Sequence, residues 1–347
     1  MSTSCLALPE LTKLTFHRDI AMFWDDEDET TVVRKLEGII NKATTSRFSH
    51  PGAKRIKTLQ LPCNPTGIRN PLPLLLLKSK LLDLETCEPP WFRRDARTRE
   101  IQDVVRNHCP NLKHLHFPQN YDEDQDGQAA RAFIRGCSGL KSFTSAYFMD
   151  SIGPGPRMIL SELLKHHYTT LENFELTDPQ QVNSHDLHNV LSQCKQLKRF
   201  WVANYEEEDS MCGIVVEDIS RSDWVCTELI ELSLALNRCP SDGDLFGDLE
   251  EDEAEGDPYE WLTASTTKRA FQQIGRLNKL EVLRIDIDRS SRTKAKEKDY
   301  AWDLTLWSGW LSELAGLRNL RILGLKADFW SCMKQEEVNS CMSTGHR

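Results

Sequence analysis

Histidine and cysteine are the residue types in this 347-residue chain whose chemistry could serve a metal site or a nucleophile. The eleven cysteines form no CxxC pair, so the ligand spacing of a zinc ribbon is missing. His185 and His188 are three residues apart and could meet on one helix face, but only Asp186 adds a further ligand type close by. The pattern indicates polar residues on a helix surface, and we predict neither a metal nor a cofactor.

The sequence also lacks the common motifs of catalysis, including HExxH, GxSxG and glycine-rich phosphate loops. Its one glycine cluster, Gly-Pro-Gly-Pro at 153–156, has prolines where a phosphate cradle needs backbone N–H donors. That cluster therefore predicts a turn. We predict that the chain is not an enzyme.

Charge and hydropathy narrow the classes of partner. A formal net charge of -10 disfavours nucleic acid, because phosphate contacts need a basic face. The longest uncharged run in the leucine-rich stretch, 71–77, is far short of the roughly 20 apolar residues of a membrane span. Residues 1–14 lack the basic and apolar regions of a signal peptide. We expect an intracellular protein, cytoplasmic or nuclear, with reduced cysteines and protein partners.

A six-residue pattern, apolar-x-x-apolar-x-apolar, recurs along the whole chain. Two of its units are imperfect, with serine at Ser79 and Ser145. The ten units begin at Leu11, Ile56, Ser79, Leu112, Leu140, Leu171, Leu197, Leu229, Leu280 and Leu320.

The residue three positions before each start supports this register, because it is apolar in all ten units. These residues are Leu8, Ala53, Leu76, Cys109, Cys137, Tyr168, Cys194, Cys226, Leu277 and Leu317. Four cysteines among ten positions are a clear excess and indicate a small buried corner residue. Two units, 56–64 and 112–120, extend to LxxLxLxxN, and 79–87 has cysteine in place of the asparagine. This is the leucine-rich-repeat signature.

Segments of helical period separate the predicted strands. They are 96–107, 128–135, 156–167, 184–193 and 267–276, with Ser184 and Asp186 suited to a helix start. Alternating strands and helices predict an α/β fold. We expect a leucine-rich-repeat solenoid with a curved parallel sheet on its concave face and helices on its convex face.

The spacing of the units also predicts the domain organisation. We expect a single repeat domain over 8–327, with an acidic insertion at 242–257 and a polar, basic insertion at 289–298. Such charge runs are typical of solvated loops. Residues 328–347 contain neither a further strand nor an amphipathic cap, and we expect an irregular tail.

Three units, 109–117 (CPNLKHLHF), 194–202 (CKQLKRFWV) and 226–234 (CTELIELSL), resemble the repeats of F-box proteins and of ribonuclease-inhibitor-like proteins. Residues 273–325 are similar to the repeats of fungal F-box-type leucine-rich proteins, and the likeness covers about residues 8–327. It implies a non-catalytic protein-interaction module that recognises substrates for a cullin-RING (SCF-type) ubiquitin ligase. The alternative is a regulator or inhibitor of another enzyme that acts through the concave face.

An F-box helical module is not evident before the first repeat, since only seven residues precede Leu8. From the unusual ends of the sequence we expect a truncated or alternatively spliced product, which a search for a longer transcript would test.

Strand alternation predicts which side chains face away from the leucine core, at two and four residues after each start. These are Lys13, Thr15, Thr58, Gln60, Leu81, Asp83, His114, His116, Ser142, Thr144, Asn173, Glu175, Arg199, Trp201, Glu231, Ser233, Val282, Arg284, Ile322 and Gly324. Trp201 beside Arg199 is the leading candidate for a binding hot spot, because Trp and Arg dominate binding energy at interfaces. Its alternative is packing on a neighbouring strand. The predicted partner-binding residues are Trp201, Arg199, His114, His116, Arg284 and Glu175.

Overall fold

A computed structural model describes residues 13–15, 31, 34–35, 38, 56–60, 81–88, 98–117, 127–145, 156–177, 182–202, 213–237, 268–287 and 312–325. The chain divides into two compact units, Met1–Leu171 and Glu172–Arg347. The predicted insertions at 242–257 and 289–298 and the predicted tail at 328–347 lie outside the described residues.

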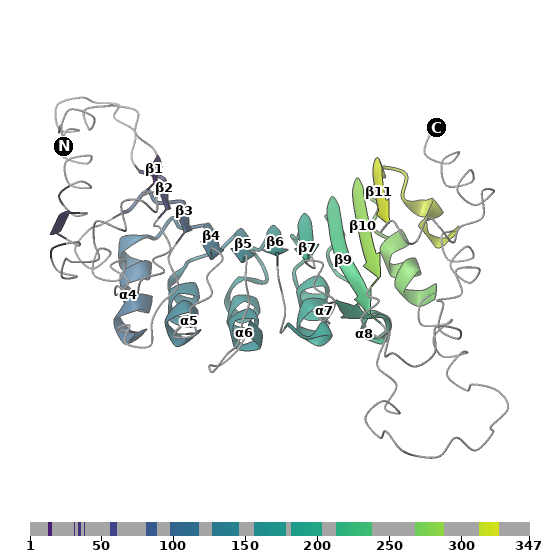
Figure 1. Ribbon diagram of the computed structural model, residues 1–347, viewed down its shortest axis with the longest axis horizontal. Helices are drawn as coiled ribbons and strands as arrows, with labels where there is room; N and C mark the ends of the chain where they lie inside the picture. Colours follow the sequence, from purple (N-terminus) through teal and green to yellow (C-terminus); the bar gives the residue numbers. More distant parts are fainter. Residues whose placement is uncertain are drawn as a thin grey trace, which may run out of the picture. The chain divides into compact units, whose positions relative to one another are not determined.

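The first unit contains a parallel sheet of short strands with helices on one face (Figure 1). Its strands are β1 (Lys13–Thr15), β2 (Thr58–Gln60), β3 (Thr86–Glu88), β4 (His114–Phe117) and β5 (Ser142–Ser145), each paired with the next. The helices α4 (Thr98–His108), α5 (Gly127–Gly136) and α6 (Pro156–His167) follow the last three strands and pack against one another in that order.

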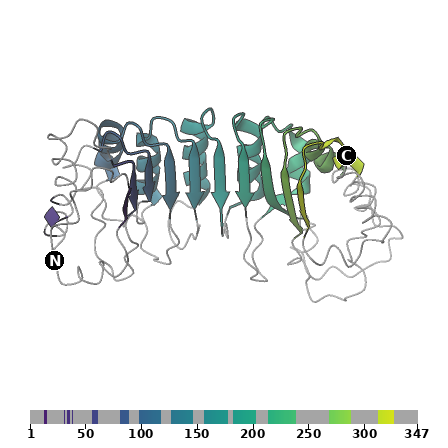
Figure 2. The ribbon, with the colours of Figure 1, turned by 90° about the horizontal axis from the view of Figure 1, so that it is seen from above.

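The second unit repeats this plan with longer strands toward its end. Its described elements are β6 (Asn173–Leu176), α7 (Ser184–Gln193), β7 (Arg199–Val202), β8 (Ile214–Val215), α8 (Val216–Arg221), β9 (Glu231–Asn237), a helix over 268–275, β10 (Val282–Ile287), the 3-10 helix η4 (Ser312–Gly316) and β11 (Ile322–Leu325). The strands follow the order β6-β7-β9-β10-β11, and β8 pairs with the end of β9. Figure 2 shows the strands running side by side in one direction.

Inward-facing side chains fix the register between neighbouring strands. Leu59 of β2, Leu115 of β4 and Phe143 of β5 are almost fully buried. In the second unit Phe174 stacks on Phe200 with ring centroids 5.4 Å apart, and both rings are fully buried. Because a slip of one residue would turn every such side chain to solvent, the apolar pattern permits one pairing.

A repeated backbone contact also joins each strand to the one before it. The amides of Glu85 and Thr86 both donate to the carbonyl of Lys57, at 2.8 and 2.9 Å. Corresponding amide pairs donate to the carbonyls of Glu85, Lys113, Glu172, Lys198, Ile230 and Glu281. Each strand entrance in these repeats therefore has its polar groups satisfied, as buried backbone requires.

The predicted register of the third repeat is wrong. The strand is Thr86–Glu88, and its repeat begins at Leu84, five residues after Ser79. The outward-facing residues of this repeat are therefore Thr86 and Glu88 in place of Leu81 and Asp83. Leu81 is buried and accepts a 3.0 Å hydrogen bond from the amide of Leu84, as Cys109 does from Leu112.

With that correction the first unit has a regular period. Thr58, Thr86, His114 and Ser142 pair in succession at equivalent positions and lie 28 residues apart. Cys87 consequently fills the inward position that Leu59 and Leu115 fill in the adjacent strands. Its side chain is fully buried.

Four predicted corner cysteines, Cys109, Cys137, Cys194 and Cys226, are buried free thiols, which confirms their assignment to the core. Burial raises the pKa of the Cys109, Cys194 and Cys226 thiols to about 12, so they stay protonated and inert.

The corner predicted at Tyr168 is wrong, because its side chain is exposed and the buried corner residue is His167. The turn before Leu171 is one residue longer than elsewhere, since the Leu171 amide bonds to the His167 carbonyl four residues back. The His167 ring bridges two backbone groups, with Nδ1 3.3 Å from the Leu140 amide nitrogen and Nε2 2.9 Å from the Ile134 carbonyl. Burial lowers the pKa of His167, which favours the neutral ring.

The helices predicted at 156–167 and 184–193 begin and end where α6 and α7 do. The other predicted helices differ from the observed helices by one or two residues at the described ends. The N-cap of α7 is Asn183, whose side chain accepts a 2.8 Å bond from the amide of Asp186. Ser184 instead donates to the Asp218 carboxylate of α8 and accepts from the Val215 amide of β8. This small extra β8–α8 layer was not predicted.

Close packing between helices leaves no room for a side chain at Gly136. A Cβ atom there would lie 2.7 Å from both the Gln102 carbonyl oxygen and the Val105 Cβ of α4. Gly139 differs, because its nearest contact would be 3.6 Å from Thr170.

In the residues that the structure describes, each unit thus contains stacked strand–turn–helix repeats with a parallel sheet on one side and helices on the other. This is the α/β architecture of a leucine-rich-repeat solenoid, as the sequence predicted. Within the described residues, no helix is long and apolar enough to cross a membrane.

Candidate protein-binding face

The face of each sheet opposite the helices carries the side chains that the repeat pattern directs away from the core. Alternation along each strand places the second and fourth residue of every repeat on this face. Four predicted binding residues, Glu175, Arg199, Trp201 and Arg284, lie on it in the second unit. His114 and His116 occupy equivalent positions of β4 in the first unit.

In the second unit, three strands bring two arginines to one glutamate. Arg199 of β7 is directly opposite Glu231 of β9, and its Nε and Nη2 lie 2.9 and 2.8 Å from Glu231 Oε2. Arg284 of β10 reaches diagonally to Glu231, and its Nη1 donates to Oε1 at 2.6 Å. Both carboxylate oxygens are thus occupied, one by each arginine.

The Glu231 carboxylate holds these two cations in place. Its side chain is only 16% exposed, whereas those of Arg199 and Arg284 are 65% and 45% exposed. Burial alone would raise the pKa of Glu231, but the hydrogen bonds from Arg284 and Arg199 outweigh it and lower that pKa. Glu231 therefore stays ionised, and the group of three carries one net positive charge toward solvent.

Trp201 lies on β7 two residues after Arg199 and is 37% exposed. Its register neighbours are Glu175 of β6 and Ser233 of β9, and Ser233 in turn pairs with Arg284. Because the Ser233 side chain is small and buried, the Trp201 and Arg284 side chains on either side of it extend farther from the sheet. An indole in this setting offers a broad apolar surface at little cost in side-chain entropy.

Apolar area continues along this face toward β11. Ile322 is 49% exposed and pairs with Val282 of β10. Gly324 pairs with Arg284, and a Cβ atom at Gly324 would lie 3.2 Å from Arg284 Cγ, so the arginine stem rests over the glycine. The second unit therefore presents aromatic, aliphatic and cationic groups together.

The corresponding face of the first unit is polar and internally hydrogen-bonded. Thr15 donates to the Gln60 side-chain oxygen at 2.9 Å, and Gln60 donates to the Glu88 carboxylate at 2.5 Å. His114 and His116 are half-buried beside this ladder. Polar side chains that already bond one another offer less to a partner than the exposed groups of the second unit.

Sequence reasoning missed the central role of Glu231, although alternation placed it on this face. The sequence did offer one indication of it. Glu231 occupies the same repeat position as Arg199, so the two side chains can form a charge pair across neighbouring strands.

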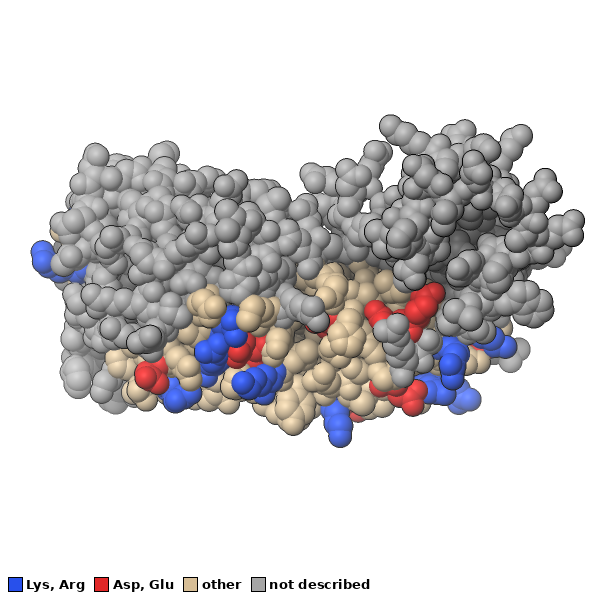
Figure 3. All heavy atoms as spheres, turned by 90° about the horizontal axis from the view of Figure 1, so that it is seen from below, with Lys and Arg blue, Asp and Glu red and all other residues tan. Residues whose placement is uncertain are grey.

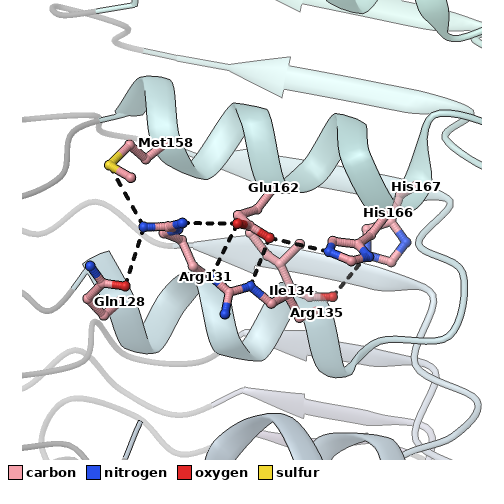
Figure 4. Close-up of polar contacts among 8 residues, drawn as sticks. All are labelled: Gln128, Arg131, Ile134, Arg135, Met158, Glu162, His166 and His167. Atoms are coloured by element: carbon pink, nitrogen blue, oxygen red, sulfur yellow. Dashed lines mark hydrogen bonds and ion pairs between the residues drawn. The ribbon is translucent and has the colours of Figure 1, made fainter. Parts of the chain in front are cut away.

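A second charged cluster, on the helix side of the first unit, was also missed (Figure 4). Arg131 and Arg135 of α5 point toward Glu162 of α6, with Arg131 Nη2 3.0 Å and Arg135 Nε 2.8 Å from its oxygens. His166 Nε2 lies 3.3 Å from the same carboxylate. The sequence indicated this cluster only through the spacing of four residues between Arg131 and Arg135 and between Glu162 and His166, which places each pair on one helix face.

The Glu162 cluster stabilises the packing of α5 on α6. Burial disfavours the charged carboxylate, but the hydrogen bonds from Arg135 and Arg131 lower the pKa of Glu162 to about 2. Charged residues of both signs are interspersed over the described part of the helix side (Figure 3). This surface has the mixed charge of a solvated helix layer.

The two histidines of α7, His185 and His188, differ in their burial. His185 is exposed, whereas His188 is buried, with Nε2 3.4 Å from the Ser222 hydroxyl. The expectation of surface polarity was therefore wrong for His188, because the β8–α8 layer covers it. Among the described residues, no three His, Cys, Asp or Glu side chains gather as a metal site would require.

Comparison with known proteins assigns the chain to no family. No family model matches the chain, and no curated protein matches it. A solved structure, the leucine-rich-repeat-containing protein LegL7 from Legionella pneumophila, is 10% identical. The match covers 96% of this chain and 97% of that chain, with a TM-score of 0.43.

Proposed function

We propose that this chain is a non-catalytic protein-interaction module that binds its partner through the outward face of the sheet in its second unit. The observation that carries the proposal is the grouping of three substantially exposed side chains on the two strands that flank β9, with Trp201 and Arg199 on β7 and Arg284 on β10. Trp and Arg are the residue types that most often dominate interface energy.

The packing of the repeats supports a rigid platform for such a face. Arg199 and Trp201 both lie on β7, whose inward-facing Phe200 is buried and stacks on the buried Phe174 of β6. Side chains on a fixed backbone lose less entropy on binding than side chains on loops. The arginines are further restrained by Glu231.

The specific form of this function that we propose is substrate recognition for a cullin-RING ubiquitin ligase, in an intracellular setting. It follows from the resemblance of three repeats to those of F-box proteins. The partner would then be a protein destined for ubiquitination, held by the outward face. A fluorescent fusion of the chain would report its compartment.

Affinity purification of the tagged full chain from its native cells tests the proposal. Trp201→Ala removes the exposed indole, and Tyr168→Ala is the matched control because Tyr168 is an exposed aromatic residue in the turn after α6. Circular dichroism would verify that both variants fold. We expect one or more proteins to be lost with Trp201→Ala and retained with Tyr168→Ala.

The identity of the proteins that are lost with Trp201→Ala distinguishes the ligase role from the role of an enzyme regulator. Cullin, adaptor or ubiquitinated proteins would support the ligase role. A single enzyme whose rate changes when the purified chain is added would instead identify a regulator. If neither Trp201→Ala nor the pair Arg199→Ala and Arg284→Ala changes the recovered set, the proposed face is wrong.

A further inference from the structure

The arrangement of charges on the second unit specifies the chemistry of a partner beyond its being a protein. In the described structure, the guanidinium groups of Arg199 and Arg284 bond only to Glu231, through three nitrogens in total. Two guanidinium groups carry ten N–H donors between them. Most of these donors remain directed toward solvent, on side chains that are 65% and 45% exposed.

Glu231 prepares this pair for an anion without neutralising it. One carboxylate between two guanidiniums leaves one net positive charge, and its hydrogen bonds restrain both arginine side chains. An arginine fork held by a neighbouring carboxylate is suited to bidentate recognition of a second carboxylate. Because the side chains are already ordered, binding costs less rotamer entropy than it would for free arginines.

The surroundings of the pair select a mixed acidic and apolar ligand. Trp201 and Arg284 flank the buried Ser233, so an apolar side chain over Ser233 would contact the indole while a neighbouring carboxylate met Arg284. Ile322 extends the apolar area on the side of β11. Glu175 lies beyond Trp201 and disfavours an acidic residue there. The positive charge of Arg284 on one side of Trp201 and the negative charge of Glu175 on the other therefore set the direction in which a segment is bound.

We infer that the outward face of the second unit binds a segment of a partner protein in which carboxylate side chains alternate with apolar ones, the carboxylates meeting Arg199 and Arg284 and an apolar side chain meeting Trp201. This inference rests on the proposed function and names its ligand. Arg199 and Arg284 are separated by one strand, β9, so the two sites lie about 10 Å apart across the sheet. A short peptide can span both.

Fluorescence anisotropy with the full chain and three pools of labelled synthetic peptides tests the inference. The peptides are about twelve residues long, which span about 40 Å when extended. One pool alternates Asp or Glu with Leu or Phe, the second has Lys or Arg at the charged positions, and the third has Gln or Asn. We expect the acidic pool to bind about tenfold more tightly than the other two, with affinity that falls as salt is raised.

Two substitutions and one control locate the binding. Arg199→Gln and Arg284→Gln should each weaken binding of the acidic pool about fivefold. Arg276→Gln is the matched control, because Arg276 also forms an exposed ion pair, 3.1 Å from Asp223, but lies in the turn after the 268–275 helix. It should leave the affinity unchanged. The double change Arg199→Lys with Arg284→Lys keeps the charge and should recover only part of the affinity if the planar forks matter.

Each outcome has one meaning. Equal binding of the acidic and neutral pools, preference for the basic pool, or unchanged affinity in Arg199→Gln and Arg284→Gln would overturn the inference. If that occurs while Trp201→Ala still loses its partner in cells, the proposed face stands and the ligand chemistry is wrong. If neither Trp201→Ala nor the pair Arg199→Ala and Arg284→Ala loses a partner in cells, the proposed function itself fails. Tight binding of duplex or single-stranded nucleic acid by the same arginines would also contradict a peptide ligand.

Discussion

Replacing Glu162 with Gln should destabilise the first unit in a way that depends on pH. The carboxylate is 10% exposed and has Arg131, Arg135 and His166 within 3.3 Å. Hydrogen bonds from the two arginines outweigh burial and lower the pKa of Glu162 from 4.5 to about 2. At about 1.36 kcal/mol per pKa unit this corresponds to about 3.4 kcal/mol. Solvent screening through its partly exposed partners, Arg135 and His166, reduces the expected contribution to about 2 kcal/mol.

The sign of the pH dependence follows from the depressed pKa. Above pH 4.5 the carboxylate is ionised in both the folded and the unfolded chain, so its full contribution to stability is present. As the pH falls from 4.5 toward 2, the unfolded chain takes up the proton first and the contribution is lost. Urea unfolding of the wild-type chain and of Glu162→Gln at several pH values would measure this. We expect the variant to be about 2 kcal/mol less stable at pH 7, with a smaller difference below pH 4.5.

Asp103→Asn is the matched control for this experiment. Asp103 is 72% exposed and lies 3.8 Å from Arg106 on the same helix, so its loss should cost less than about 0.5 kcal/mol at any pH. A Glu162→Gln penalty as small as that of the control, or a penalty that stays constant from pH 7 to pH 3, would refute the reasoning.

Three further predictions concern the core. The five described cysteines should resist a thiol reagent at pH 8 until the chain is denatured, since all are buried; rapid labelling of any of these five in the native chain, located by peptide mass spectrometry, would contradict their placement. Gly136→Ala should lower the free energy of unfolding by about 2 kcal/mol because the new methyl group meets α4, whereas Gly139→Ala should change it by less than about 0.5 kcal/mol. Leu84→Ala should cost about 2 to 5 kcal/mol and Leu82→Ala less than about 1 kcal/mol, as measured by urea unfolding; the reverse order would contradict the corrected register of β3.

The repeat pattern was enough to predict the fold class, most helices and nine of the ten strand registers, because leucine spacing and burial are directly coupled. It failed at β3 for a physical reason. Residues 71–84 contain apolar side chains at many spacings, so several registers match equally well. The strand that forms, Thr86–Glu88, has Cys87 inward and lacks the leucines that define the pattern.

The corner at His167 shows a different limit. Tyr168 stands three positions before Leu171 and therefore fits the apolar pattern. The turn is nevertheless one residue longer, and the buried His167 ring bridges two backbone groups. Turn length depends on hydrogen bonds that composition does not encode. The sequence did not predict the β8–α8 layer, because its two elements are too short to show a hydrophobic period.

Alternation correctly directed Arg199, Trp201, Glu175 and Arg284 away from the core, while their role in binding stays a prediction. The sequence could not show that Glu231 joins the two arginines. That contact depends on β9 lying between β7 and β10 despite a long insertion, and on the diagonal reach of Arg284 across one strand.

Site-specific photocrosslinking tests most directly whether the outward face of the second unit is the binding surface. Benzoylphenylalanine at position 201 would report contacts of that face, and the same group at His185 would report contacts of the exposed side of α7. We expect a covalent adduct with one partner from position 201 and none from position 185 in native cells. An adduct that forms from position 185 alone would place the binding surface on the helices and contradict the account.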